Sequence, residues 1–283
     1  MTGTRLRPIA FTKFRLADSI SEPIWSPRGT KVAWTDWSDP DDPEIFVADA
    51  RGLGARLLAH GGGLAWSPKG GLIAYSGQRG IHLIAPSGRK HRRLTAGRSD
   101  GGPTWSPDGK HLAFERGGGN ESHIYVVGSD GRGLRRLNDQ LSHSAAWSPD
   151  GRQIAYLRKT DSTADTSAIY VVNVNGTHEY RATTPASTFG SVPEWSPDST
   201  SLMFVRFVGS GFDHREIVVV QRDGTAERRV ADRAFAPVWA PNGRRIAYTA
   251  EGHPHACGGR IAILVAKTDG ATAKRVTPCR HRP

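Results

Sequence analysis

The sequence has few of the features that mark membrane-spanning, helical or disulfide-rich proteins. Its 283 residues include only two Cys, which permit at most one disulfide. No apolar run approaches the roughly 18 residues that a membrane helix needs, and the N-terminus has no apolar core of signal-peptide length. Long amphipathic helical stretches and a G-x-S-x-G nucleophile motif are also missing. These absences exclude a transmembrane helix, a helical bundle and an α/β-hydrolase-type peptidase.

The feature that is present in abundance is a repeat that opens on tryptophan. Successive copies are spaced 41, 39, 42, 48 and 44 residues apart. A period of roughly 40 to 45 residues is typical of four-stranded propeller blades. The six repeat tryptophans are Trp25, Trp66, Trp105, Trp147, Trp195 and Trp239.

Each repeat contains the pattern of four short strands. Ser-Pro-Asp-Gly or a close variant follows the tryptophan, and this combination of residues favours a tight turn between the first two strands. An apolar alternation, a β-branched run and a basic-then-apolar segment follow in order, as in 152–156, 169–172 and 135–137. The pattern predicts an all-β, six-bladed β-propeller of four-stranded antiparallel blades. We expect each tryptophan to pack between adjacent blades and each basic segment to form the outermost strand.

The repeat also resembles a known family. Trp-Ser-Pro-Asp-Gly, then Ile-Ala-Phe/Tyr, Ile-Tyr-Val and Arg-Leu-Thr, is similar to the TolB-type six-bladed propeller repeat over residues 21–279. The family includes periplasmic TolB, which engages lipoprotein and colicin partners, stand-alone propellers, and lid domains of serine peptidases. The resemblance implies a binding propeller. TolB has in addition an N-terminal α/β domain, for which this chain has no room.

The repeats define the expected domain organisation. Residues 21–279 form the propeller, residues 1–20 an N-terminal extension and residues 280–283 a basic tail. Residues 9–17 echo the second and last strands of a repeat, so we expect part of them to add to the last blade and close the ring.

The two cysteines, Cys257 and Cys279, both belong to the last repeat. A disulfide between them would pin the C-terminus and contribute on the order of 3 kcal/mol. Two unbridged thiols are an alternative, and so is a metal site with the neighbouring histidines, although the spacing is not that of structural zinc sites. We expect a disulfide, no metal and no cofactor.

The chain carries a net charge of +11, from 38 Lys and Arg against 27 Asp and Glu. The Arg-Arg pairs recur once per repeat and would be spread around the circumference, whereas nucleic acid requires a basic stripe. We therefore do not expect nucleic acid as a partner. A protein is the expected partner, and the charge would also attract an acidic protein, polysaccharide or membrane surface. We expect a monomer.

Two sets of residues are candidates for a binding site. The first set precedes the innermost strands, where a propeller approaches its central channel; it consists of Glu22, His60, Asp100, His143, Ser144 and Ser191. The second set lies in long loops between the second and third strands of the later repeats, where exposed aromatic residues favour recognition. Its expected partner-contacting members are Phe207, Phe212 and His214.

The residues leave two classes of function open. The first is a non-enzymatic propeller that binds a protein through rim loops or channel mouth, with a possible role in the cell envelope or transport. The alternative is a lyase or hydrolase that uses channel histidines on a carbohydrate-like ligand; against it, Gly63, Gly102 and Ala236 occupy three equivalent channel positions. The expected location is periplasmic or secreted, with the leader missing from the sequence, and the alternative is cytoplasmic.

Overall fold

A computed structural model describes residues 23–117, 121–160, 166–185, 192–208, 214–251, 262–270 and 273–276. Six sheets, each of four antiparallel strands, make up this part of the chain. The predicted fold class, a six-bladed β-propeller, is confirmed. In the part of the chain that the structure describes, no helix is long and apolar enough to span a membrane.

The chain divides into two compact units of three blades each. One unit comprises Met1–Gly119 with Tyr125–Arg136, and the other Asn120–Ile124 with Leu137–Pro283. The boundary runs through strand β11 of the third blade.

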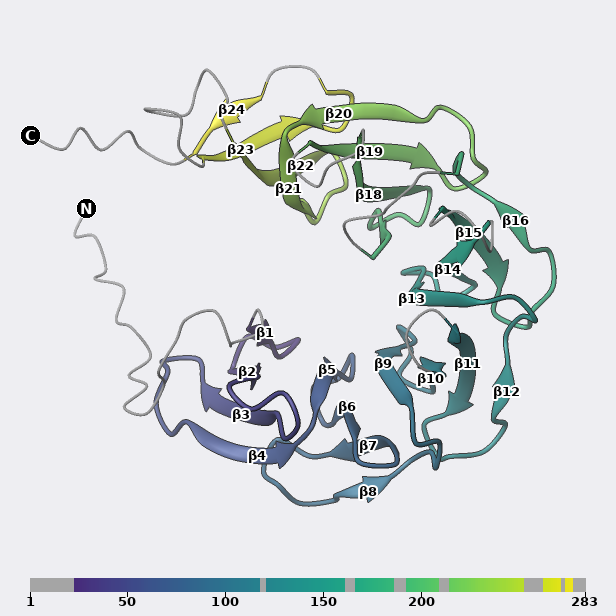
Figure 1. Ribbon diagram of the computed structural model, residues 1–283. Helices are drawn as coiled ribbons and strands as arrows, with labels where there is room; N and C mark the ends of the chain where they lie inside the picture. Colours follow the sequence, from purple (N-terminus) through teal and green to yellow (C-terminus); the bar gives the residue numbers. More distant parts are fainter. Residues whose placement is uncertain are drawn as a thin grey trace, which may run out of the picture. The chain divides into compact units, whose positions relative to one another are not determined.

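The first unit contains the first three blades, which Figure 1 draws in purple to blue. The strands of the first blade are β1 (Ile24–Trp25), β2 (Lys31–Asp36), β3 (Glu44–Asp49) and β4 (Arg56–His60). Those of the second are β5 (Gly62–Trp66), β6 (Ile73–Gly77), β7 (Gly80–Ile84) and β8 (Arg92–Arg93). Those of the third are β9 (Asp100–Trp105), β10 (His111–Arg116), β11 (His123–Gly128) and β12 (Arg135–Arg136).

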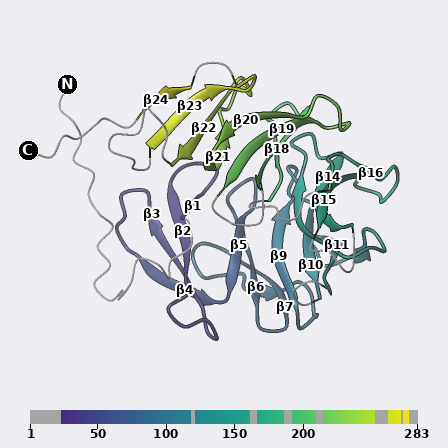
Figure 2. The same ribbon diagram turned by 45° about the horizontal axis from the view of Figure 1, so that its top comes forward.

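The second unit contains the last three blades, teal to yellow in Figures 1 and 2. The strands of the fourth blade are β13 (Ser142–Trp147), β14 (Gln153–Lys159), β15 (Ser167–Asn173) and β16 (Tyr180–Arg181). Those of the fifth are β17 (Glu194–Trp195), β18 (Ser201–Phe207), β19 (Arg215–Gln221) and β20 (Arg228–Asp232). Those of the sixth are β21 (Ala234–Trp239), β22 (Arg245–Ala250), β23 (Ala262–Lys267) and β24 (Lys274–Arg275).

Side chains of the repeat motif close the turn between the first two strands of a blade. In the third blade, Ser106 Oγ donates to Asp108 Oδ1 at 2.6 Å and accepts from the amide of His111 at 2.9 Å. Asp108 Oδ1 also accepts from the amide of Lys110. Gly109 has φ +71°, a left-handed conformation that glycine adopts without strain. The hydrogen bonds to Ser106 and Lys110 lower the pKa of the Asp108 carboxyl.

Tryptophans join successive blades within each unit, as predicted, although the buried indole nitrogen of Trp239 has no hydrogen-bond partner among the described residues. In three of them the indole N–H donates at 3.1–3.2 Å to the carbonyl just before the tryptophan of the preceding blade. The pairs are Trp66 with Ile24, Trp105 with Ala65, and Trp195 with Ala146. Trp25, in the first blade of its unit, differs from this pattern because 58% of its surface is exposed.

The central strands are buried more continuously than an alternating pattern would suggest. Five consecutive residues of β18, from Ser201 to Val205, are buried, because a blade inside a unit packs against a neighbour on each face. The basic segments form the outermost strands, as predicted, and several are only two residues long. Short, charged edge strands resist pairing with other chains.

Candidate functional site

The residues proposed from the sequence divide between the two units. His60 and Asp100 lie in the first unit, and His143, Ser144, Phe207 and His214 lie in the second. The other candidates fall outside the described residues: Glu22, Ser191, Phe212, Cys257 and Cys279, together with residues 1–22, which include the proposed ring-closing segment.

His60 is the last residue of the outermost strand β4 and pairs with Glu44 of β3. Only Gly61 separates β4 from the next innermost strand, so there is no separate segment leading into β5. The ring Nδ1 of His60 lies 3.1 Å from the carboxylate of Asp42, and about half of each side chain is exposed. An exposed pair of this kind is worth little to stability.

Asp100 begins the innermost strand β9, and its carboxylate is fully buried. Arg116 binds both oxygens, from Nε at 2.6 Å and from Nη2 at 2.9 Å. Thr95 Oγ1 and the amide of Gly97 also donate to this carboxylate. The guanidinium of Arg116 in turn stacks over Tyr125, 4.8 Å from the ring centroid. The structure thus uses Asp100 within its own blade, to hold the start of an innermost strand.

His143 and Ser144 lie where the innermost strand β13 forms a bulge. The register with β14 shifts between His143 and Ala146, and Ser144 has φ +58°. His143 Nδ1 lies 3.0 Å from Ser144 Oγ. The same left-handed conformation recurs three residues before the tryptophan in three other blades, at Gly63, Gly102 and Ala236. Backbone geometry therefore accounts for glycine at two of these positions.

Two aromatic rings, one from the fifth and one from the sixth blade, contact the same arginine. The guanidinium carbon of Arg215 lies 5.6 Å from the ring centroid of Phe207 and 5.1 Å from that of Phe235. Both rings are partly exposed, and Val208 beside them is 37% exposed. We call Phe207, Val208, Arg215 and Phe235 the Phe–Arg patch. Cation–π contacts with the two rings help to hold the Arg215 side chain in place.

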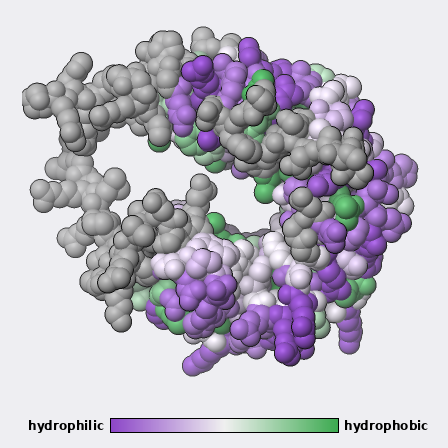
Figure 3. Space-filling model, in the orientation of Figure 1, coloured by the Kyte–Doolittle hydropathy of each residue, from purple (hydrophilic) through white to green (hydrophobic). Residues whose placement is uncertain are grey.

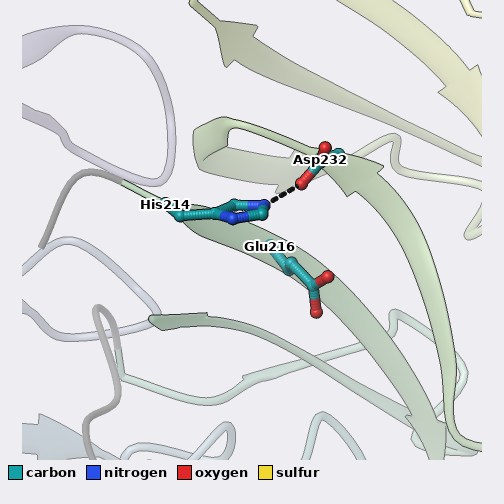
Figure 4. A group of neighbouring side chains, drawn as sticks. All are labelled: His214, Glu216 and Asp232. Atoms are coloured by element: carbon teal, nitrogen blue, oxygen red, sulfur yellow. Dashed lines mark hydrogen bonds and ion pairs between the residues drawn. The ribbon is translucent and has the colours of Figure 1, made fainter. Parts of the chain in front are cut away.

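The strands that carry the patch also carry a network of charges. His214 Nε2 contacts Asp232 Oδ1, at the end of β20, while the carboxylate of Glu216 points away from this pair (Figure 4). Glu216 is buried and binds Arg206 at 3.3 Å and Arg229 at 2.9 Å.

Ligand atoms of His214, Glu216 and Asp232 lie within 4.8 Å of one another, a spacing that a metal ion could bridge. Glu216 is already neutralised by two arginines, so this group is better described as a charge network than as a cation site. Burial acts to raise the pKa of Asp232, but the hydrogen bond and charge of His214, with Arg229, lower it overall.

Of the predicted partner contacts, Phe207 belongs to the Phe–Arg patch and His214 to the charge network beside it. The loop pattern does not predict Arg215 or Phe235, because Arg215 begins a strand and Phe235 belongs to the next blade. Arg215 could have been found from the register of β18 and β19, because this register pairs it with Phe207.

The fold and the repeat define a class, that of six-bladed β-propellers. A family model, the TolB beta propeller domain, matches residues 11–235, and the chain belongs to this family.

A curated relative and two solved structures illustrate the range of similar proteins. A TolB homolog of Chlorobium luteolum is 28% identical over 130 residues, which cover 44% of this chain and 28% of that protein. A putative TolB from Agrobacterium tumefaciens is 20% identical, with a TM-score of 0.58 and coverage of 78% of this chain and 83% of that one. An oligogalacturonate lyase from Vibrio parahaemolyticus is 12% identical, with a TM-score of 0.67 and coverage of 89% and 75%. At these identities the two structures show the fold alone, and the alignment spans about a quarter of the C. luteolum protein.

Proposed function

We propose that this chain is a non-enzymatic propeller that binds a protein partner through the Phe–Arg patch. The observation that carries the proposal is the contact of Arg215 with two partly exposed aromatic rings. Aromatic residues and arginine dominate the energetics of protein interfaces, and the aromatic rings bury a large area with few rotatable bonds. An arginine ordered before binding loses less entropy when a partner closes over it.

The charge network supports this proposal because it links the strands that carry Phe207 and Arg215. Glu216 holds Arg206 and Arg229, and the contact between His214 and Asp232 joins the base of the loop to the end of β20. The partner surface that fits is apolar opposite Phe207 and Phe235, with an acidic group opposite Arg215. The net charge of +11 favours approach to an acidic partner.

Family membership supports a second part of the proposal, a location in the cell envelope. TolB-type proteins of the periplasm act by binding, and this chain shares their propeller. We infer a periplasmic location. Fractionation of the native host with an antibody to this protein tests it, and recovery in the cytoplasm would favour the alternative.

The enzymatic alternative, a lyase or hydrolase, stays a prediction. Its candidate histidines lie in different units: His60 contacts Asp42 and His143 contacts Ser144. Asp100, the described candidate carboxylate, is bound by Arg116. The similarity to an oligogalacturonate lyase concerns the fold.

Site-directed photo-crosslinking tests the binding proposal. A photoreactive residue replaces Val208 at the patch or, as a control, Leu134, which is 44% exposed on the third blade. In host cells we expect a saturable cross-linked protein from position 208 only. Adding Arg215→Ala should abolish that product without moving the thermal unfolding midpoint by more than a few degrees. The same products from both positions, or products insensitive to Arg215→Ala, would contradict the proposal.

A further inference from the structure

The second blade lacks an ion pair that the fourth blade contains. In the fourth blade Arg158 Nη1 lies 2.7 Å from Glu179 Oε2, and its guanidinium stacks 4.3 Å from the ring centroid of Tyr170. The hydroxyl of Tyr156 donates to Glu179. Burial and the Glu179 hydrogen bond raise the pKa of this tyrosine. Arginine, tyrosine and glutamate form one network across three strands.

The strand registers identify the equivalent residues of the second blade. Tyr156 pairs with Tyr170, as Tyr75 pairs with His82. In the fourth blade Tyr170 pairs with Arg181, and Glu179 lies two residues before that arginine. In the second blade His82 pairs with Arg93, and His91 lies two residues before that arginine. Arg158 and Gly77 each follow their blade's repeat tryptophan by eleven residues. The second blade therefore keeps the first tyrosine and replaces Arg, Tyr and Glu by Gly77, His82 and His91.

These replacements bring two imidazoles and a phenol together. His82 Nδ1 lies 3.2 Å from His91 Nε2, and the hydroxyl of Tyr75 lies 2.8 Å from the same nitrogen. The three rings are stacked, with centroids 5.3–6.1 Å apart. Tyr75 is buried, His82 is partly buried and His91 is exposed, so the group is open to solvent on one side.

A main-chain carbonyl determines which ring nitrogen of His82 carries the hydrogen. Its Nε2 lies 3.1 Å from the carbonyl oxygen of Gln78, which can only accept, so Nε2 carries the hydrogen. In the neutral ring the lone pair is then on Nδ1, which faces His91.

Two features of this arrangement match a metal site. Two nitrogens bound tetrahedrally at about 2.0–2.1 Å from one ion are about 3.3 Å apart, close to the separation of the two ring nitrogens here. Metal-binding histidines commonly donate their other N–H to a carbonyl, as His82 does to Gln78. Imidazole is a suitable ligand for zinc, copper and nickel.

Gly77 makes room for the histidine. A Cβ at this position would lie 2.8 Å from Cδ2 of His82 and 3.1 Å from Cε2 of Tyr75. The third, fourth and fifth blades have arginine at the position of Gly77. Glycine in the second blade therefore removes a positive charge, and it also lets the two rings lie over the backbone.

We propose that Tyr75, His82 and His91 form a binding site for a divalent ion of the zinc or copper type, with water completing the coordination. The ligands include no carboxylate, and Arg93 lies beside His82 in a run, Arg89–Arg93, that is exposed throughout. The outer strand β8 lies in a hydrophilic part of the surface (Figure 3). These positive charges lower the affinity for a cation, so the site suits an exchangeable ion rather than a structural one.

Zinc binding to the purified full chain tests the proposal. Calorimetric titration with ZnCl₂ should show one bound equivalent fewer in His91→Ala and in His82→Tyr than in the native chain. Tyrosine is the residue at the position of His82 in the third and fourth blades, so this variant keeps the ring stack. Copper titration followed by electron paramagnetic resonance gives a second readout, a two-nitrogen signal that both variants should lose.

Two further variants separate this site from other ligands in the chain. Cys257→Ser with Cys279→Ser, and His123→Ala, whose Nδ1 lies 3.0 Å from the Gln140 carbonyl, should both keep the zinc equivalent. Unchanged stoichiometry in His91→Ala and His82→Tyr, with thermal midpoints showing that they fold, would overturn the proposal. Loss of the equivalent in the cysteine variant alone would overturn it as well.

Discussion

The third and fifth blades place an arginine at the same position, eleven residues after the tryptophan, and use it differently. In the third blade Arg116 binds the fully buried carboxylate of Asp100. In the fifth blade Arg206 binds Glu216 and, at 2.5 Å, Glu227, on the strand that also carries Phe207 of the Phe–Arg patch. Glu227 lies two residues before Arg229, which pairs with Val218. In the third blade the corresponding arginine is Arg136, which pairs with Tyr125, so the residue equivalent to Glu227 is Leu134. One repeat position thus stabilises a strand start in one blade and supports a surface in another.

The largest effect is expected from breaking the buried pair of the third blade. Asp100→Ala leaves the guanidinium of Arg116 without its partner, and removing one member of a buried pair costs about 3–5 kcal/mol. Because Arg116 is 29% exposed, we expect the free energy of unfolding, measured with urea, to fall by about 3 kcal/mol. Asp100→Ala with Arg116→Met should recover part of this loss. A change below about 1 kcal/mol would show that the pair is not important for stability.

A smaller effect should follow from giving the third blade the glutamate of the fifth. Leu134→Glu in the Asp100→Ala background supplies a carboxylate two residues before Arg136, the position of the glutamate in the fourth and fifth blades. This carboxylate is intended to pair with Arg116. We expect recovery of about 1 kcal/mol, the upper range for a partly exposed pair. Urea unfolding measures it, with Leu134→Gln as the control of equal size and no charge. Equal recovery by both variants would show that charge is not the cause.

The smallest effect should come from the exposed pair of the fifth blade. His214 and Asp232 are 40% and 48% exposed, so Asp232→Asn should cost under about 1 kcal/mol. The folded-state pKa of Asp232 is lowered, so its contribution is fully present above the unfolded pKa of about 3.9 and is lost as the pH falls through the folded value. Thermal midpoints of the two chains should therefore differ at pH 6 and converge at pH 2. A difference that persists at pH 2 would contradict this assignment.

The blade count, the turns and the outer strands could all be predicted from the sequence. The turn residues Ser106 and Asp108 bond within five residues, so the motif itself contains their partners. The strand order within each blade also followed from neighbouring segments, because antiparallel strands joined by short turns pair in sequence order.

The candidate site was predictable only in part. The loop pattern predicts Phe207 and His214 as contacts, whereas the second phenylalanine that contacts Arg215 comes from the following blade. The Tyr75, His82 and His91 group had no recognisable spacing, since its members stand on or beside three strands and come together only through the register. The pattern that predicts Asp100 near the channel mouth contains no sign that Arg116 binds its carboxylate.

By itself the sequence determined that the chain folds as six four-stranded blades, since local turns and alternating strands depend on residues close together in the chain. The tertiary structure decided which carboxylate each arginine binds. Arg116 reaches back 16 residues to Asp100, and Arg158 reaches forward 21 residues to Glu179. Such pairs depend on strand register and on which neighbouring side chain offers an acceptor at hydrogen-bonding distance, and a repeat motif that is the same in every blade does not contain that information.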